Sequence, residues 1–204
     1  MIRAPFIGIA RHRLFTDGEG VTTLVAFHGC PLRCRYCINS HSWTDSFESE
    51  WLTPEELYNR TRIDDLYFQA TRGGITFGGG EPSLYPEFIT QFRKIVGDSW
   101  KICLETSLNI DIEKLKLLAP VTDNFIIDIK DMNPDIYRRY TSRGNEQVLS
   151  NLRYIASLER QTDCNIRLPL IRGFNTREDI QKSKDILQNL GFEKIEQFRY
   201  IIKN

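Results

Sequence analysis

Short apolar runs of strand length alternate along this chain with longer segments whose apolar residues recur at helical spacing. The strand candidates are residues 21–27, 74–77, 101–105, 124–129, 166–171 and 195–200. The helical segments lie between them, at residues 54–70, 86–96, 110–118, 134–140, 148–158 and 176–190. Such alternation is typical of a parallel sheet covered by helices, and about six units favour an incomplete barrel. The pattern therefore predicts an α/β fold, a partial (β/α)6 barrel with a parallel sheet, in a single domain over residues 1–204.

The ends of two helices carry capping signals. Thr53 precedes Pro54 and two glutamates, which is the composition of an N-cap and a first helical turn. Thr176 takes the same place before the last helix, and Gly191 stands where a C-terminal cap is expected. The two threonines predict where the helices begin, and Gly191 predicts where the last helix ends.

Charge and hydropathy exclude several classes of partner. Lys plus Arg and Asp plus Glu both number 27, so no excess of charge draws the chain to nucleic acid or to an anionic membrane. The apolar stretch at residues 5–10 stops at Arg11, which makes it too short for a secretory signal or a membrane span. We expect a cytoplasmic protein that binds neither nucleic acid nor membrane.

Three cysteines lie in one short loop, residues 28–39, directly after the first strand candidate. Cys30, Cys34 and Cys37 have the spacing C-x3-C-x2-C, which is too close for a disulfide framework and suits metal binding. A [4Fe-4S] cube normally takes four thiolates, so three ligands leave one iron open to another molecule. The loop therefore predicts a reactive cluster.

Other roles for the cysteines stay open. With His28 or His41 the loop could ligate structural zinc as a Cys3His set, although zinc knuckles usually join two hairpins and this set offers one close pair. Cys103 and Cys164 stand in or beside apolar runs, where a lone cysteine usually packs as a small hydrophobic residue. Neither is expected to be a ligand.

A glycine-rich turn ends the second strand candidate, with the sequence Gly78-Gly79-Gly80-Glu81-Pro82. The missing Cβ atoms would let the backbone approach a ligand and present its carbonyl groups, and Glu81 adds an acceptor. Taken alone, three glycines indicate only a flexible turn. Beside the cysteine loop, they favour a ligand-binding turn.

Charged residues at the ends of later strands are a second line of evidence for a binding site. In a strand, Asp128 and Lys130 share one face, so inside a barrel mouth they are expected to pair with each other or with a ligand. Glu105-Thr106 and Arg167 occupy similar places on neighbouring strands. The alternative is an ordinary ion pair on a solvated edge, which is about as plausible for Glu105 and Arg167.

The cysteine loop, the glycine-rich turn and the βα alternation together resemble the radical S-adenosylmethionine (radical SAM) superfamily. The resemblance implies a radical SAM type of barrel in which Cys30, Cys34 and Cys37 hold a [4Fe-4S] cluster and SAM chelates its fourth iron. It implies that an electron from the cluster cleaves SAM to a 5′-deoxyadenosyl radical. Tyr36 matches the aromatic position beside the adenine, and the turn at Glu81 would hold the methionine ammonium.

More narrowly, the chain resembles the activating enzymes of glycyl radical enzymes, in residues 16–20, 27–39 with Trp43, 75–82, 104–106, 128–130 and 166–173. This likeness implies abstraction of a hydrogen from one glycine of a protein substrate, a glycyl radical enzyme, with a flavodoxin- or ferredoxin-type electron donor. Asp17 would face the substrate peptide, while Lys130 and Arg167 would hold the carboxylate and ribose region of SAM. Asp17 and Lys130 are thus the catalytic candidates. The likeness also implies a possible monovalent cation, which Glu105, Thr106 and Asp128 would surround.

The sequence departs from that family at several points. The DGPG run of typical members is Asp17-Gly18-Glu19-Gly20 here, and Arg172 replaces the usual proline before Gly173. The last strand is followed only by residues 201–204, so we expect a short C-terminal end and a wider opening for substrate. Residues 44–74 carry no cysteine-rich insert, so auxiliary clusters are not expected.

Two other functions stay open. The chain could use the same cofactors on a small molecule or short peptide in cofactor or modified-nucleoside synthesis. It could also be a non-catalytic metal-binding module in which the cysteine loop is structural.

Overall fold

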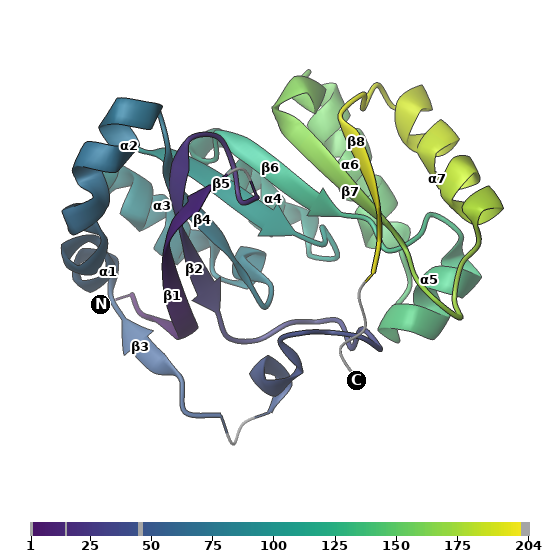
Figure 1. Ribbon diagram of the computed structural model, residues 1–204, viewed down its shortest axis with the longest axis horizontal. Helices are drawn as coiled ribbons and strands as arrows, with labels where there is room; N and C mark the ends of the chain where they lie inside the picture. The colour runs from purple at the N-terminus through teal and green to yellow at the C-terminus, as the bar shows by residue number, and fades with distance from the viewer. Residues whose placement is uncertain (1, 15, 45–46, 201–204) are drawn as a thin grey trace.

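Eight strands form one sheet in the computed structural model, which describes residues 2–14, 16–44 and 47–200. Their order is β3-β1-β2-β4-β5-β6-β7-β8 (Figure 1). The strands are β1 (Ala4–Leu14), β2 (Val21–Phe27), β3 (Glu50–Leu52), β4 (Gly74–Gly79), β5 (Lys101–Thr106), β6 (Asn124–Asp128), β7 (Cys164–Leu170) and β8 (Ile195–Arg199). β2 and β4 to β8 run parallel, whereas β1 and β3 are antiparallel additions at one edge. The parallel strands are those that the sequence predicts, so the α/β fold is confirmed.

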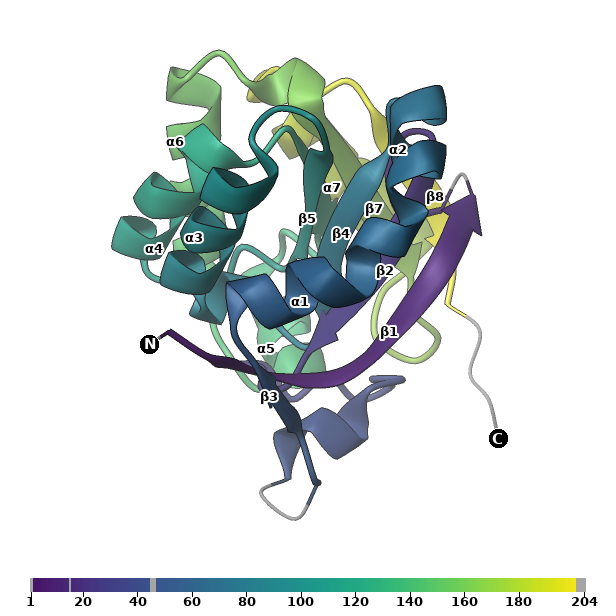
Figure 2. The same cartoon turned by 90° about the vertical axis from the view of Figure 1, so that its left-hand side faces the viewer.

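The helices cover one face of this sheet and leave the other face open. They are α1 (Pro54–Thr61), α2 (Asp65–Thr71), α3 (Pro86–Val96), α4 (Ile112–Leu118), α5 (Pro134–Thr141), α6 (Glu146–Ser157) and α7 (Arg177–Asn189). Figure 2 shows α3, α4 and α6 grouped on the same side of the strands. Strand β5 shows how the two faces divide, because Ile102 and Leu104 are fully buried while Cys103 and Glu105 point to the opposite face. Among the described helices, none has the length and apolar character needed to cross a bilayer.

The helix predicted over residues 54–70 is two helices. Thr53 caps α1 as expected, because its Oγ1 accepts from the backbone N–H of Glu56 at 3.1 Å. A 3-10 turn over Arg62–Asp64 then separates α1 from α2. The carboxylate of Asp64 is fully buried in this turn and accepts hydrogen bonds from Arg11 and from Thr23, the latter at 2.8 Å. A contact to another part of the sheet therefore overrides the local helical pattern. At the last helix, Thr176 caps α7 in the predicted way.

Strand β1 is absent from the sequence prediction, which excluded a signal or a membrane span at residues 5–10 but assigned no structure there. The strand pairs with β2 through two register shifts, between Phe6 and Gly8 and between Ala10 and Arg13. Each shift interrupts the period of two that identifies a strand in sequence. The three-residue strand β3 is too short to give any periodic signal.

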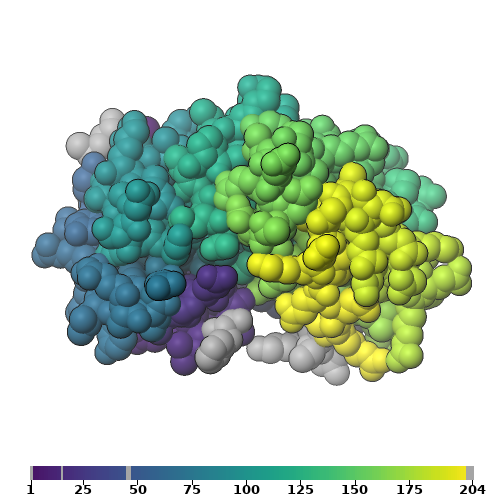
Figure 3. Space-filling model, turned by 90° about the horizontal axis from the view of Figure 1, so that it is seen from above, coloured from purple at the N-terminus to yellow at the C-terminus, as the bar shows by residue number. Residues whose placement is uncertain are grey.

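The sheet curves but does not close. In the described chain, β8 pairs with β7 alone and β3 with β1 alone. Seen from above, the N-terminal hairpin in purple and β8 in yellow face each other across a hollow (Figure 3). The residues that follow β8, 201–204, lie outside the described residues, so the expected short C-terminal end stays a prediction.

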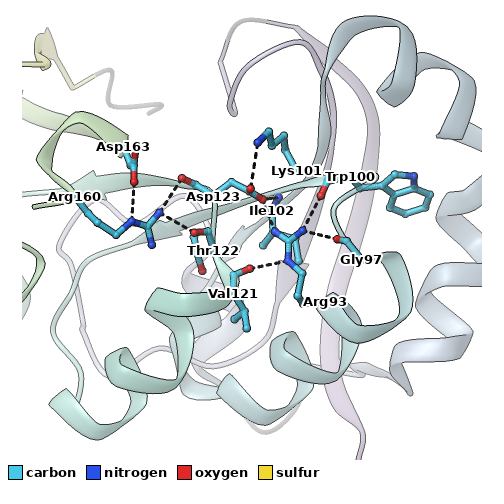
Figure 4. Close-up of polar contacts among 10 residues, drawn as sticks. All are labelled: Arg93, Gly97, Trp100, Lys101, Ile102, Val121, Thr122, Asp123, Arg160 and Asp163. Atoms are coloured by element: carbon cyan, nitrogen blue, oxygen red, sulfur yellow. Dashed lines mark hydrogen bonds and ion pairs between the residues drawn. The ribbon is translucent and has the colours of Figure 1, made fainter. Parts of the chain in front are cut away.

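Two arginines bind the loops that lead into β5 and β6 (Figure 4). Arg93 of α3 donates to the carbonyl oxygens of Gly97, Trp100 and Val121 at 2.6, 3.0 and 3.0 Å. Arg93 also pairs with Asp123, whose Oδ2 accepts from the backbone N–H of Ile102 at 2.7 Å. Arg160 donates in the same way to the carbonyl oxygens of Thr122 and Asp123.

Replacing Arg93 by alanine is expected to lower the free energy of unfolding by about 2–3 kcal/mol, because three carbonyl groups lose their donor and the partly exposed Asp123 carboxylate keeps only the Ile102 N–H and Lys101. Arg93→Lys should recover little of the lost free energy of unfolding, since one ammonium cannot reproduce the planar fork of donors of a guanidinium. Urea unfolding measures the stability of both variants. The matched control is Arg153→Ala on α6, an exposed position where a change within about 0.5 kcal/mol is expected. A loss below about 1 kcal/mol in Arg93→Ala would contradict the role of this network.

Candidate active site

A cavity of about 480 Å³ lies against the open face of the sheet. It collects residues from the cysteine loop, the N-terminal hairpin and the C-terminal ends of the parallel strands. Of the residues predicted from sequence, the lining includes Asp17, Cys30, Cys34, Cys37, Gly79, Gly80, Glu81, Glu105, Thr106, Asp128, Lys130 and Arg167. The predicted residues Tyr36 and Gly78 are not part of the lining. Twelve positions from separate parts of the sequence thus meet at one cavity.

Backbone hydrogen bonds hold the cysteine loop in place. The N–H groups of Arg33 and Arg35 donate to the carbonyl oxygens of Thr141 and Tyr140 at 2.8 and 2.9 Å. At the start of the loop, His28 N–H donates to the carbonyl oxygen of Pro5 at 2.9 Å. The loop has little regular secondary structure, so these contacts to α5 and β1 position its thiols.

The three thiols lie in an apolar environment. Burial raises the pKa of Cys30 to about 12 and that of Cys34 to about 11, and it raises the pKa of Cys37 in the same direction. Buried thiols are inert unless something stabilises the thiolate, and a bound metal does so by displacing the proton. The thiols are therefore suited to a cluster and poorly suited to act as free nucleophiles.

The two histidines considered for a zinc site are turned elsewhere. The ring of His28 stacks on Phe47 at 6.0 Å between centroids, and the ring of His41 lies 5.0 Å from Phe47. Neither histidine lines the cavity of the three thiols. Within residues 2–14, 16–44 and 47–200, no three His, Cys, Asp or Glu side chains gather closely enough to bind a single metal ion. The Cys3His interpretation is thus not supported by this geometry.

The glycine-rich turn packs directly on the cysteine loop. Gly80 N–H donates to the carbonyl oxygen of Phe27 at 2.9 Å, and Glu81 N–H donates to that of Gly29 at 2.8 Å. A Cβ on Gly80 would lie 2.1 Å from the Gly29 oxygen. A Cβ on Gly79, whose φ is +90°, would lie 2.6 Å from the Cβ of Ala26. These glycines therefore let two segments of the chain approach each other, which the sequence argument attributed to a ligand.

Glu81 joins this turn to the end of β5. The side chain is 1% exposed, and its Oε1 accepts from Thr106 Oγ1 at 2.7 Å and from Ser83 N–H at 3.2 Å. Its Oε2 accepts from the N–H and the hydroxyl of Ser107 at 2.9 and 2.7 Å. These bonds occupy about the full acceptor capacity of a carboxylate. The predicted contact of Glu81 with a ligand ammonium stays a prediction, and Ser107 is a residue that sequence reasoning missed.

Charges of both signs line the open face of the sheet. Lys130 donates to Asp128 at 3.0 Å, and Arg167 pairs with Glu105 at 2.6 Å. The sequence predicted the first pair from strand periodicity. Arg13 of β1 pairs with the buried Asp17 and is a lining residue that the sequence argument missed, because β1 itself was not predicted.

The electrostatics of these pairs differ. Burial lowers the pKa of Lys130, but the charges of Asp128 and Cys34 outweigh burial, so the pKa is raised and the ammonium stays charged. Burial, with the carboxylate of Asp128 nearby, raises the pKa of Glu105 to about 7, against the opposing effect of Arg167. The cavity thus presents fixed cations beside carboxylates that repel each other.

Tyr36 lies behind the cavity wall. Its hydroxyl donates to the carbonyl oxygen of Arg172 at 3.3 Å, and its ring lies 5.8 Å from that of Phe174 and 6.1 Å from that of Tyr140. The cavity lining also includes Trp43, Tyr200 and Asn39, whose amide donates to the Gly79 carbonyl oxygen at 2.9 Å. Asn39 and Trp43 belong to the segments that carry the family resemblance but were assigned no role from sequence, and Tyr200 was expected only as the end of the last strand.

The donor set fits a three-thiolate iron–sulfur cluster with a zwitterionic ligand. Three thiols converge on the cavity, and Lys130 and Arg167 supply cationic donors for a carboxylate. Carboxylates and strand-end carbonyl groups complement an ammonium or a sulfonium. The residues present therefore match the chemistry that the cysteine spacing suggested.

Comparison with known proteins agrees with this geometry. The sequence model of the Radical SAM superfamily matches residues 24–185. A pyruvate formate-lyase-activating enzyme from Clostridium pasteurianum is 31% identical over 90% of this chain and 77% of its own length. A (2S)-3-sulfopropanediol dehydratase activating enzyme from Klebsiella oxytoca is 31% identical over 86% of this chain and 74% of its own length.

Solved structures show the same fold at lower identity. The crystal structure of Streptococcus suis SuiB matches with a TM-score of 0.65 at 12% identity, over 85% of this chain and 38% of that chain. The structure of TYW1 with a lysine-pyruvate adduct bound matches with a TM-score of 0.61 at 22% identity, over 88% of this chain and 65% of that chain. This chain thus spans less than two thirds of each of these structures. Membership in the superfamily implies a [4Fe-4S] cluster and SAM. The chain belongs to the radical SAM superfamily, and within it to the family of the pyruvate formate-lyase-activating enzymes.

Proposed function

We propose that this protein activates a glycyl radical enzyme by removing a hydrogen atom from one glycine of that protein. The observation that carries the proposal is that Cys30, Cys34 and Cys37 line one cavity whose walls also hold paired charges of both signs. The relatives named as activating enzymes support the choice of a protein substrate. When both groups are bound, the cluster and SAM together would supply the reductive cleavage of SAM that generates a 5′-deoxyadenosyl radical.

The residues of the chain would bind, orient and shield these groups. Cys30, Cys34 and Cys37 would ligate three irons, and Lys130 and Arg167 would hold the carboxylate and ribose region of SAM. The Gly78–Gly80 turn and Glu81 would provide the ammonium site, and Tyr36 would support the adenine side. Because Lys130 is buried and charged, its contact to a carboxylate would be little screened by water.

A monovalent cation is proposed beside Glu105, Thr106 and Asp128. The raised pKa of Glu105, to which the Asp128 carboxylate contributes, supports the proposal, because a cation would relieve the repulsion between two partly buried carboxylates. Asp17 is proposed to meet the substrate peptide, since it lies in the cavity wall and belongs to the turn between β1 and β2. Its pairing with Arg13 would hold the carboxylate in place.

The electron that reduces the cluster is proposed to come from a flavodoxin- or ferredoxin-type protein. Such a donor and an oxygen-sensitive cluster suit a reducing compartment such as the cytoplasm, and the described cysteines are all free thiols.

The test begins with anaerobic reconstitution and reduction by dithionite in the presence of SAM. Release of 5′-deoxyadenosine establishes the cofactor chemistry, and a glycyl doublet in electron paramagnetic resonance after addition of a glycyl radical protein from the same genome establishes the substrate. A partner whose radical glycine is replaced by alanine is the matched control and should give no doublet. Cofactor cleavage without any protein radical would favour a small molecule or peptide as substrate. Stoichiometric zinc without cleavage would instead favour the non-catalytic module.

A further inference from the structure

A surface rich in arginine lies against the outer side of the cysteine loop. Residues 28–39, 134–144 and 171–175 contain six arginines and a single acidic residue, Asp135, in a chain that has equal numbers of positive and negative residues overall. All six arginines are exposed. We call this set the arginine face: Arg33, Arg35, Arg138, Arg139, Arg143 and Arg172.

Direct contacts join the three segments into one surface. In Figure 1 the chain that follows β2 runs toward α5, and Arg143 Nε donates to the carbonyl oxygen of Pro31 at 3.2 Å. Arg139 of α5 donates to the carbonyl oxygen of Phe174 at 3.0 Å. The loop after β7 is tied back to the cysteine loop by the bond from Tyr36 to the Arg172 oxygen. The three segments are therefore bonded to one another beside the loop that carries the thiols.

Few negative charges neutralise this face. Arg138 is the only one of the six with an ion pair among the described residues, to Glu146 at 3.9 Å and at an exposed position. Asp179 exerts some attraction on Arg139, but its Oδ2 accepts from the N–H of Thr176 at 2.9 Å as part of the helix cap. The positive charge is thus left available to a partner.

We propose that the arginine face is the docking surface for an acidic one-electron donor protein. The inference rests on the proposed function, because it requires a cluster in the cysteine loop. In the step it serves, the donor loses one electron and the cluster gains one, and no bond forms or breaks. Arg33 and Arg35 flank Cys34, so a protein bound here would be separated from the cluster only by the loop itself.

The position of the face leaves the cavity accessible. The substrate side is the hollow between the N-terminal hairpin and β8 (Figure 3), whereas the arginine face is built on α5 and the outside of the loop. Electrostatic attraction of this kind speeds the encounter of weakly bound redox partners without requiring a large interface.

Nucleic acid fits the arginine face less well than an acidic protein. The chain as a whole is neutral, and the aromatic residues beside the face are already in contact: Tyr36 packs against Tyr140 and Phe174, and the Trp43 ring lies 5.4 Å from the Arg33 guanidinium.

The experiment compares the cluster-loaded double variant Arg138→Glu/Arg172→Glu with the matched control Arg62→Glu/Arg153→Glu, whose exposed arginines lie outside this face. The probe is a flavodoxin of net negative charge. Its dissociation constant is measured by titration, and stopped-flow absorbance follows reduction of the cluster. At low ionic strength we expect binding to weaken and reduction to slow by about tenfold or more in the first variant, with little change in the control. Added salt should slow the wild type toward the variant.

Dithionite separates failure of this inference from failure of the proposed function. With dithionite as reductant, both variants should release 5′-deoxyadenosine at the wild-type rate, whereas a wild type that releases none would refute the proposed function itself. Equal flavodoxin kinetics in variant and wild type would overturn the docking surface. So would loss of affinity for a transfer RNA or for the glycyl radical protein with flavodoxin binding unchanged, because the face would then serve that other partner.

Discussion

Replacing Cys34 by alanine is expected to remove the cluster and, with it, all reductive cleavage of SAM. Cys34 is the middle cysteine of the loop and 8% exposed, and its thiol lines the cavity together with Cys30 and Cys37. The two remaining thiols cannot chelate a cube that already lacks a fourth protein ligand. After anaerobic reconstitution, iron should fall from about four per chain to near zero, and 5′-deoxyadenosine should fall to background.

The matched control is Cys164→Ala, because Cys164 is 1% exposed in β7 but lies outside the cavity. This variant should keep its iron and its activity, with only a modest loss of stability. Circular dichroism and urea unfolding of Cys34→Ala would establish that the protein itself remains folded. A Cys34→Ala protein that retained a full complement of iron and cleaved SAM would exclude this loop as the cluster site.

A single methyl group on Gly80 is expected to have an almost equally large effect. The Cβ of Gly80→Ala would lie 2.1 Å from the carbonyl oxygen of Gly29 and 2.9 Å from that of Phe27. Both atoms are backbone, so they cannot move aside without displacing the start of the cysteine loop. Overpacking of this kind costs about 1–3 kcal/mol, and the displacement should also separate the thiols.

Iron content after reconstitution measures the effect of Gly80→Ala, with urea unfolding to separate loss of the site from loss of the fold. We expect the variant to fold and to bind well under half of the wild-type iron. Gly8→Ala is the control, since a Cβ on Gly8 meets no atom within 4 Å and its φ is not in the left-handed region. Wild-type iron in Gly80→Ala would show that the turn and the loop are not coupled in the way the contacts indicate.

Much of the fold could be predicted because the sequence signals that define its helices and strands are short-range. Strands β2, β4, β5, β6 and β7 are short segments rich in apolar or β-branched residues, and residues such as Thr53 and Thr176 cap their helices through contacts only three positions away. The errors arise where a distant contact prevails. Asp64 interrupts the predicted first helix to meet Arg11 and Thr23, and β1 loses its period of two at two register shifts.

The candidate site shows the same division. Asp128 and Lys130 could be paired from sequence, because residues two apart share one face of a strand. Glu105 and Arg167 are 62 positions apart, and only the order of β5, β6 and β7 in the sheet makes them partners. Arg13 could not be found at all without β1.

The sequence by itself determined the chemistry of this protein. The spacing of Cys30, Cys34 and Cys37 and the βα alternation are local properties of the chain, set by covalent distance and by the period of each element. Only the tertiary structure decided what the other groups do. The glycines let the glycine-rich turn pack against the cysteine loop, and the Glu81 carboxylate joins the ends of β4 and β5. The arginines lie together on one face. These outcomes depend on strand order and on close packing between distant segments, which local sequence patterns do not specify.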